Sequence, residues 1–264
     1  MNDTVKSVLY RLSPSLYARL LHLRYQRENI KQNMTERNTV ANEVIERHGL
    51  KILQGPFAGM SYVRQATGSA FIPKLVGNYE SELIPLVNIV IDSAYDTIVD
   101  VGCAEGYYAV GLAMRMPAVT VRAFDSNPTG QYLCKMMACE NGVEKRVLIA
   151  GSCDPTALKQ AIQGKTFLLC DCEGYEQELL MLTEIPELRN TTILVELHDC
   201  FVPGVSERIV ERFKDSHDIQ ILESQDRDVK DYPYIHFLTP QKQQMALDEI
   251  RLGAMQWAYM TPKP

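Results

Sequence analysis

The fold is decided by residues 98–108, which read Ile-Val-Asp-Val-Gly-Cys-Ala-Glu-Gly-Tyr-Tyr. An apolar run carries Asp100 near its end, a turn opens at Gly102, and a helical pattern begins near Glu105. Glycine lets the backbone turn sharply and lets a ligand approach closely, because it has no Cβ atom. Since ligands bind at the carboxyl ends of strands in open α/β sheets, we expect a cofactor at this turn.

The turn does not fit the dinucleotide-binding fingerprint, which requires glycines at relative positions one, three and six. Those positions hold Gly102, Ala104 and Tyr107. A second acid, Asp125, closes the next apolar run, about where a ribose-binding carboxylate is expected in a βαβ unit. The alternative role for Asp125 is to cap the helix that begins at Pro128.

Outward from this turn, apolar strand candidates alternate with amphipathic helices. This alternation predicts an α/β fold with right-handed crossovers and helices on both faces of the sheet. The last two strand candidates have no helix between them, so we expect them to form an antiparallel hairpin at one sheet edge. The predicted strands are 97–101, 119–124, 147–150, 166–171, 192–197, 219–223 and 235–238, and the predicted helices are about 105–115, 128–140, 155–163, 175–183 and 205–214.

Composition narrows the class of protein. The 264 residues include 27 Lys and Arg against 33 Asp and Glu, a formal charge of −6, which argues against a general nucleic-acid binder. Seven cysteines without a Cys-x-x-Cys pair or zinc-finger spacing indicate reduced thiols and a cytoplasmic protein. No apolar run reaches the roughly 20 residues that a transmembrane helix needs.

The charge is unevenly spread along the chain. Residues 1–50 hold eight Lys and Arg against five Asp and Glu, whereas the rest of the chain has a balance of −9. Residues 15–33 have the pattern of a basic amphipathic helix, which either packs on its own domain or contacts an anionic membrane or a partner. We therefore expect an N-terminal helical extension with short strands over 1–76, a main domain over 77–240, and a C-terminal helix and edge segment over 241–264.

Several separate stretches together resemble one enzyme family. The turn at 100–106 followed by Asp125 is similar to motif I and the next acidic site of class I S-adenosylmethionine-dependent methyltransferases. Residues 171–176, Asp-Cys-Glu-Gly-Tyr-Glu, and 195–198, Val-Glu-Leu-His, resemble the FkbM-like branch of that class. Upstream, the Gly-Asn-Tyr-Glu of 77–80 is similar to a stretch that precedes the fold in the same branch.

The resemblance implies a Rossmann-like, seven-stranded, mostly parallel sheet that binds S-adenosylmethionine. It also implies an O-methyltransferase that acts on a hydroxyl of a sugar, glycoconjugate or polyketide-like small molecule. Within the cofactor site, the first glycine turn would border the methionine part, Asp125 the ribose, and residues 151–154 the adenine. The implied cofactor-binding residues are Asp100, Gly102, Cys103, Ala104, Glu105, Gly106, Tyr107, Asp125, Ser126, Ser152, Cys153 and Asp171.

The catalytic candidates lie at the ends of two adjacent predicted strands. Asp171 ends one and His198 follows the other, so both are expected to face the transferred methyl group. An imidazole with a pKa near 6.5 suits a general base for a hydroxyl acceptor. Glu173 or Asp171 would orient the ring or hold the acceptor. In the alternative interpretation Asp171, His198 and Asp199 bind a divalent ion such as Mg²⁺ or Mn²⁺.

Two other functions stay open at this stage. An N-methyltransferase uses the same cofactor but needs an amine site. A non-catalytic adaptor would bind the cofactor and dock through the basic N-terminal helix, with a homodimer as one possible assembly. The expected partners are a small-molecule or glycan acceptor, without nucleic acid.

Overall fold

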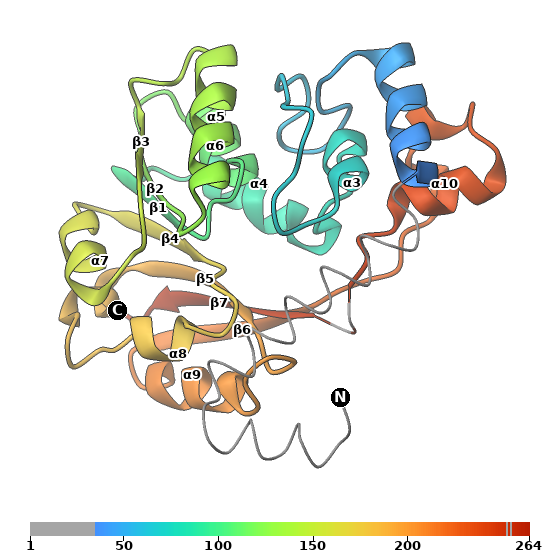
Figure 1. Cartoon of the computed structure of the whole chain (residues 1–264). Coiled ribbons are helices and arrows are strands. Elements are labelled where there is room, and N and C mark those ends of the chain that lie inside the picture. The colour runs from blue at the N-terminus through green and yellow to red at the C-terminus, as the bar shows by residue number, and fades with distance from the viewer. Residues whose placement is uncertain (1–34, 252, 254) are drawn as a thin grey trace.

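The computed structural model describes residues 35–264 apart from 252 and 254. Its centre is a seven-stranded sheet in the order β3-β2-β1-β4-β5-β7-β6, in which the pairs among β1 to β5 are parallel and β7 is antiparallel to both neighbours (Figure 1). The predicted seven-stranded, mostly parallel sheet is confirmed. The strands are β1 (Thr97–Val101), β2 (Thr120–Phe124), β3 (Val147–Ala150), β4 (Thr166–Cys170), β5 (Thr192–Leu197), β6 (His217–Glu223) and β7 (Gln256–Pro262).

Helices cover both faces of the sheet because the inner strands are apolar on both faces. Successive residues of β1 belong to opposite cores: Ile98 packs in one and Val99 in the other. The first core contains residues of α4 (Ile84–Asp92), α5 (Tyr107–Arg115) and α6 (Pro128–Glu140). The second contains residues of α7 (Pro155–Ala161), α8 (Glu176–Leu179) and α9 (Val205–Phe213).

A third apolar cluster joins segments that are far apart in the sequence. The helical residues 35–48, α3 (Phe71–Val76) and α10 (Pro240–Leu247) pack together, and in Figure 1 the blue helix and the orange α10 lie side by side. Between these helices and the sheet, the predicted short strands near 50–53 and 60–63 meet in a single antiparallel bridge, Lys51 with Ser61. The shorter 3-10 helices are η1 (Ser81–Leu83), η2 (Pro186–Asn190), η3 (Val229–Asp231) and η4 (Pro233–Ile235).

The expected C-terminal hairpin is wrong in two respects. The strand predicted at 235–238 is instead the end of η4 and a turn, because Pro233 begins a 3-10 helix and Ile235 and Leu238 pack in the third apolar cluster. The tail forms β7, which is inserted between β5 and β6 rather than added at an edge. β6 is therefore the edge strand, and Trp257 lies in the first core.

The basic segment 15–33 lies outside the described residues, so its role stays a prediction. Among the residues that the structure describes, no helix is long and apolar enough to cross a membrane.

Candidate active site

A cavity of about 650 Å³ lies at the carboxyl ends of β1, β2, β4 and β5. This volume is within the usual range for small-molecule and cofactor sites. Most of the predicted cofactor-binding residues line it, whereas Glu105 and Gly106 do not. The predicted residues on its wall are Asp100, Gly102, Cys103, Ala104, Tyr107, Asp125, Ser126, Ser152, Cys153 and Asp171.

Gly102 is required by the packing of two strand ends. Its φ is +90°, and a Cβ atom there would lie 1.7 Å from the carbonyl oxygen of Asp171. The glycine that sequence reasoning assigns to cofactor approach therefore also brings the ends of β1 and β4 together. This contact places the motif turn directly beside the catalytic candidates.

Asp125 ties the motif turn to the end of β2. Its Oδ2 accepts a hydrogen bond from the backbone N–H of Ala104 at 2.7 Å, and its Oδ1 accepts one from the N–H of Asn127 at 2.7 Å. The helix cap is Asn127, whose side chain accepts from the N–H of Thr129, so the capping alternative for Asp125 is wrong. Carboxylate oxygens accept more than one hydrogen bond, and Asp125 lines the cavity, so it retains capacity for a ligand hydroxyl.

Asp100 is a buried acid, and both of its carboxylate oxygens are without a hydrogen-bond partner among the described residues. The residue is 1 % exposed. Burial, and then the neighbouring acids Asp171 and Asp125, raise the pKa of Asp100 to about 8. A buried carboxylate on a cavity wall is satisfied by a ligand that brings a cation or donors to it.

Glu105 belongs to a closed ion cluster at the cavity wall, where Lys74 lines the cavity and Glu105 does not. Its carboxylate accepts hydrogen bonds from the Tyr62 hydroxyl at 2.6 Å, from the Lys74 ammonium at 2.5 Å, and from the N–H of Thr67 at 2.9 Å. Burial alone would raise the pKa of Glu105, but Lys74 and these hydrogen bonds hold it below its ordinary value. Glu105 therefore fastens the 62–74 segment to the motif turn instead of lining the cofactor cavity.

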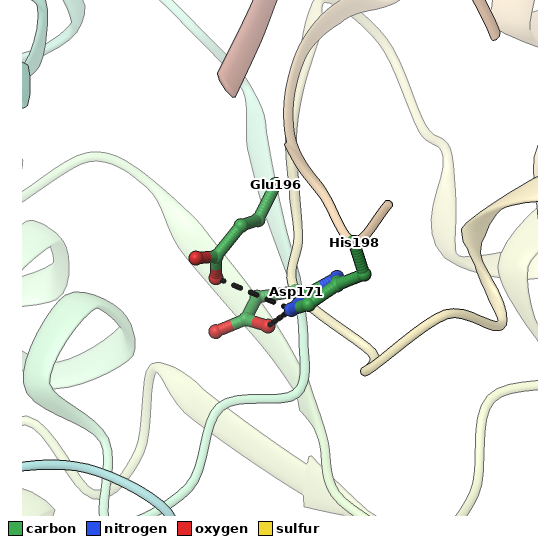
Figure 2. A group of neighbouring side chains, drawn as sticks. All are labelled: Asp171, Glu196 and His198. Carbon is green, nitrogen blue, oxygen red and sulfur yellow. Dashed lines mark ion pairs between the residues drawn. The ribbon is translucent and has the colours of Figure 1, made fainter. Parts of the chain in front are cut away.

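The side of the cavity at the ends of β4 and β5 is built around His198, which is 2 % exposed. Figure 2 shows Asp171, Glu196 and His198 converging from the ends of adjacent strands. Nε2 of His198 lies 3.4 Å from Asp171 Oδ1, 3.6 Å from Glu196 Oε2 and 4.0 Å from Glu173 Oε2. The structure therefore brings the side chains of Asp171, Glu173 and His198 together, and their catalytic roles stay a prediction.

Glu176 fixes the ring from the other side. Its Oε1 lies 2.6 Å from His198 Nδ1 and also accepts from the N–H groups of Cys172 and Gly174, at 3.1 and 3.2 Å. One carboxylate therefore shapes its own loop and sets the orientation of the imidazole. Burial opposes the charged form of Glu176, but the neighbouring His198 and these hydrogen bonds hold its pKa below the ordinary value.

The surrounding acids raise the pKa of His198. Burial lowers its pKa, but Glu196, Glu176 and Asp171 together raise it well above 6.5. An imidazolium cannot accept a proton, so the ordinary histidine pKa does not support a general-base role in this environment. Glu173 differs because its side chain is 45 % exposed. Desolvation and the Asp171 charge raise the pKa of Glu173 to about 7.

Asp199 is not part of the cluster, so its proposed role as a metal ligand is wrong. Its Oδ1 accepts from the N–H of Gly204 at 2.8 Å, and its Oδ2 from the N–H and hydroxyl of Ser206. The chain leaves the strand at Leu197, and Asp199 then holds the loop that opens α9. Glu196, instead of Asp199, is the acid that lies beside Asp171 and His198. The sequence indicates this position, because residues two apart on a strand share a face and Glu196 precedes His198 by two.

Arg251, which no sequence motif identified, also lines the cavity. Its guanidinium lies 3.5 Å from Glu80 and 3.8 Å from Glu196, and it stacks over the ring of Trp257 at 4.7 Å. It also pairs with Glu249. These contacts connect the C-terminal loop to the 77–80 stretch, whose Tyr79 and Glu80 both line the cavity.

Backbone strain is concentrated at this site. The described residues other than glycine that have positive φ are Glu80, Ala104, Glu173 and Ile250, with φ of 48° to 58°. All four line the cavity. Such conformations cost roughly 1 to 3 kcal/mol each and persist where the surrounding structure holds them, so their gathering here marks a functional site.

Solved structures of methyltransferase domains are similar to this chain in fold. The METTL16 MTase domain matches with a TM-score of 0.52 at 14 % identity, over 86 % of this chain and 81 % of that chain. A human methyltransferase 10 domain containing protein matches with a TM-score of 0.50 at 15 % identity, over 87 % of this chain and 98 % of that one. The chain has the class I S-adenosylmethionine-dependent methyltransferase fold. No protein-family profile and no curated protein matches the sequence.

Proposed function

We propose that this protein is an S-adenosylmethionine-dependent O-methyltransferase of the FkbM-like branch, acting on a hydroxyl of a sugar, glycoconjugate or polyketide-like small molecule. The observation that carries the proposal is Asp100, a buried carboxylate on the wall of a cofactor-sized cavity that has no hydrogen-bond partner among the described residues. S-adenosylmethionine carries an ammonium and a sulfonium, so its charge complements this acid. Its ribose hydroxyls complement Asp125 at the next strand end.

The FkbM-like assignment is supported by the contacts of its motif residues. Asp171, Glu173 and Glu176 of the first motif all lie within 4.0 Å of His198 of the second. The spacing of both motifs is therefore explained by one site, in which Glu176 orients the ring and the other two acids face the cavity.

When bound, the cofactor supplies a methyl group on a cationic sulfur, which becomes a neutral thioether as the carbon–sulfur bond breaks and the bond to the acceptor oxygen forms. We assign the acceptor proton to Glu173. Its carboxylate is half exposed on the cavity wall, whereas both nitrogens of His198 already face carboxylates. Asp171, Glu196 and His198 act as positioning residues for the acceptor, and much of the rate comes from holding the acceptor in line.

An amine acceptor is the second candidate, and a specific observation favours it. The acceptor side of the cavity presents more acids than bases, and tyrosine rings line the same space, a lining that attracts a cationic amine. The acids are Glu80, Asp171, Glu173, Glu196 and Glu249, the bases are Lys74, Arg251 and His198, and the rings are those of Tyr79, Tyr107 and Tyr108. The Lys74 ammonium lies over the ring of Tyr79 at 4.7 Å, so one cation of the chain already uses this lining.

Titration calorimetry with S-adenosylhomocysteine, followed by transfer of a labelled methyl group to a panel of glycans, hydroxylated small molecules and amines, tests the proposal. We expect single-site binding and a product whose mass and fragmentation place the methyl on oxygen. Methyl on nitrogen would select the second candidate. Binding without transfer to any acceptor would indicate a non-catalytic adaptor, and absence of binding by folded protein would contradict the cofactor assignment.

A further inference from the structure

We propose that Asp171, Glu196 and His198 form a binding site for a divalent transition-metal ion on the acceptor side of the cavity. The inference rests on the proposed function, because it assigns how the same site holds its acceptor. One ligand atom from each residue lies within 4.8 Å of the other two. Figure 2 shows the three side chains directed at a common point.

The distances from His198 Nε2 to the two carboxylates fit ligands that share a cation better than a ring nitrogen that hydrogen-bonds to an acid. Nitrogen–oxygen hydrogen bonds measure roughly 2.7 to 3.2 Å. His198 Nε2 is 3.4 Å from Asp171 and 3.6 Å from Glu196, and neither contact meets hydrogen-bond geometry. Ligand atoms around a tetrahedral ion with bonds of about 2.0 to 2.1 Å are separated by about 3.4 Å.

The second observation is that Glu176 holds the imidazole ring of His198 through Nδ1. Metal-binding histidines almost always donate their other ring N–H to a carboxylate or carbonyl, which fixes the ring and the tautomer. Glu176 occupies that position at 2.6 Å from Nδ1, is itself fully buried, and is held by two backbone N–H groups. Nε2 is thereby aimed at the carboxylates of Asp171 and Glu196.

The donor set indicates the class of ion. One imidazole and two carboxylates suit Mn²⁺, Zn²⁺ and related ions better than Mg²⁺, which prefers oxygen ligands alone. Three protein ligands leave coordination positions open, as catalytic sites do. Since the three residues line the cavity, those positions face the space for the acceptor. The acceptor class is then a molecule that presents an oxygen, and preferably two neighbouring oxygens, to the ion.

The test is a titration of the full-length, EDTA-treated and desalted protein with MnCl₂, followed by loss of the electron paramagnetic resonance signal of free Mn²⁺. We expect one Mn²⁺ per chain in the wild type and enhanced water-proton relaxation from an open coordination position. Glu196→Gln and His198→Ala are expected to abolish binding. Glu176→Gln is expected to weaken it about 10- to 100-fold, as for other residues that orient a ligand.

Asp199→Asn is the matched control, because Asp199 follows His198 directly but holds the 204–206 loop instead of the ring. It is expected to bind Mn²⁺ as the wild type does. Failure of the wild type to bind Mn²⁺, or wild-type affinity in Glu196→Gln, would overturn the site. S-adenosylhomocysteine binding by the same samples separates the two proposals. If it persists without Mn²⁺ binding, only the metal site fails; if it is absent while Mn²⁺ binds, only the cofactor assignment fails.

Discussion

Two buried clusters of charged side chains flank the motif turn, and they differ in how far the chain itself satisfies them. In the closed cluster, Glu105 faces one cation, Lys74, and both of its oxygens accept hydrogen bonds. In the open cluster, one imidazole faces four carboxylates, and Oε2 of Glu176 has no hydrogen-bond partner among the described residues.

This difference indicates that one buried cluster of charged side chains has a structural role and the other a functional role. A buried ion pair that is fully bonded within the chain holds segments together and has no capacity left for a ligand. An excess of acids around a cavity costs stability unless a ligand brings positive charge, so such a cluster is kept where function requires it. We therefore expect substitutions in the closed cluster to change stability, and substitutions in the open cluster to change activity.

The largest effect is expected on turnover, from a substitution in the open cluster. Glu173→Gln should lower turnover about 10²- to 10⁴-fold, because loss of a general base typically has that effect. Its free energy of unfolding should stay close to that of the wild type, since the carboxylate is half exposed. Single-turnover methyl transfer at saturating cofactor measures the first quantity and urea unfolding the second. Normal turnover in this variant would remove Glu173 from the mechanism.

In the closed cluster, a substitution is expected to lower the free energy of unfolding. Glu105→Gln leaves the Lys74 ammonium buried without a counter-ion, which should cost about 3 to 5 kcal/mol of unfolding free energy. The double variant Lys74→Met with Glu105→Leu should recover part of that loss, because apolar side chains replace both charges. The recovery is incomplete because the Tyr62 hydroxyl and the Thr67 N–H lose their acceptor. Urea unfolding compares the three proteins. A single variant as stable as the wild type would show that the pair is not structurally important.

Asp100 lies between these extremes, since it is buried but unpartnered. Asp100→Asn should weaken S-adenosylhomocysteine binding about 10- to 100-fold, which is the loss of one charge-assisted hydrogen bond. Because the pKa of Asp100 is about 8, wild-type affinity should rise with pH up to that value and then level off. Calorimetric titrations from pH 6 to 9 measure the trend, and a flat profile would exclude Asp100 as the titrating group.

The smallest effect is the pH dependence of stability. The pKa of Glu105 is below its ordinary value, so its contribution is complete above the unfolded pKa, about 4.3, and is lost as pH falls through the folded pKa. Wild-type stability should therefore decline more steeply below pH 4.3 than that of Glu105→Gln. Urea unfolding between pH 3 and 6 measures both slopes. Equal slopes would contradict the assignment.

Much of the fold could be predicted because β1 to β5 are short apolar runs bounded by turn residues. The exception is the C-terminal part, where residues 235–238 alternate like a strand but pack against helices, and where β7 inserts between two earlier strands. The local pattern of apolar residues does not indicate which distant segments of the chain pack against one another.

Site residues that belong to a sequence motif could be predicted. The motif turn and the paired acidic motifs gave Asp100, Asp171 and His198. Lys74 and Arg251 could not be found, because they reach the cavity from segments without a motif. Asp199 was misassigned because its neighbour His198 points into the cavity, whereas the chain turns immediately afterwards.

The central claim, that the unpartnered acid marks a cofactor site, is tested most directly by titrating S-adenosylhomocysteine into the wild type at pH 7 in two buffers of different ionisation enthalpy. The account predicts one site per chain and release of about one proton, because Asp100 is largely protonated before binding and charged afterwards. Absence of binding by folded protein, or binding without proton release, would contradict it.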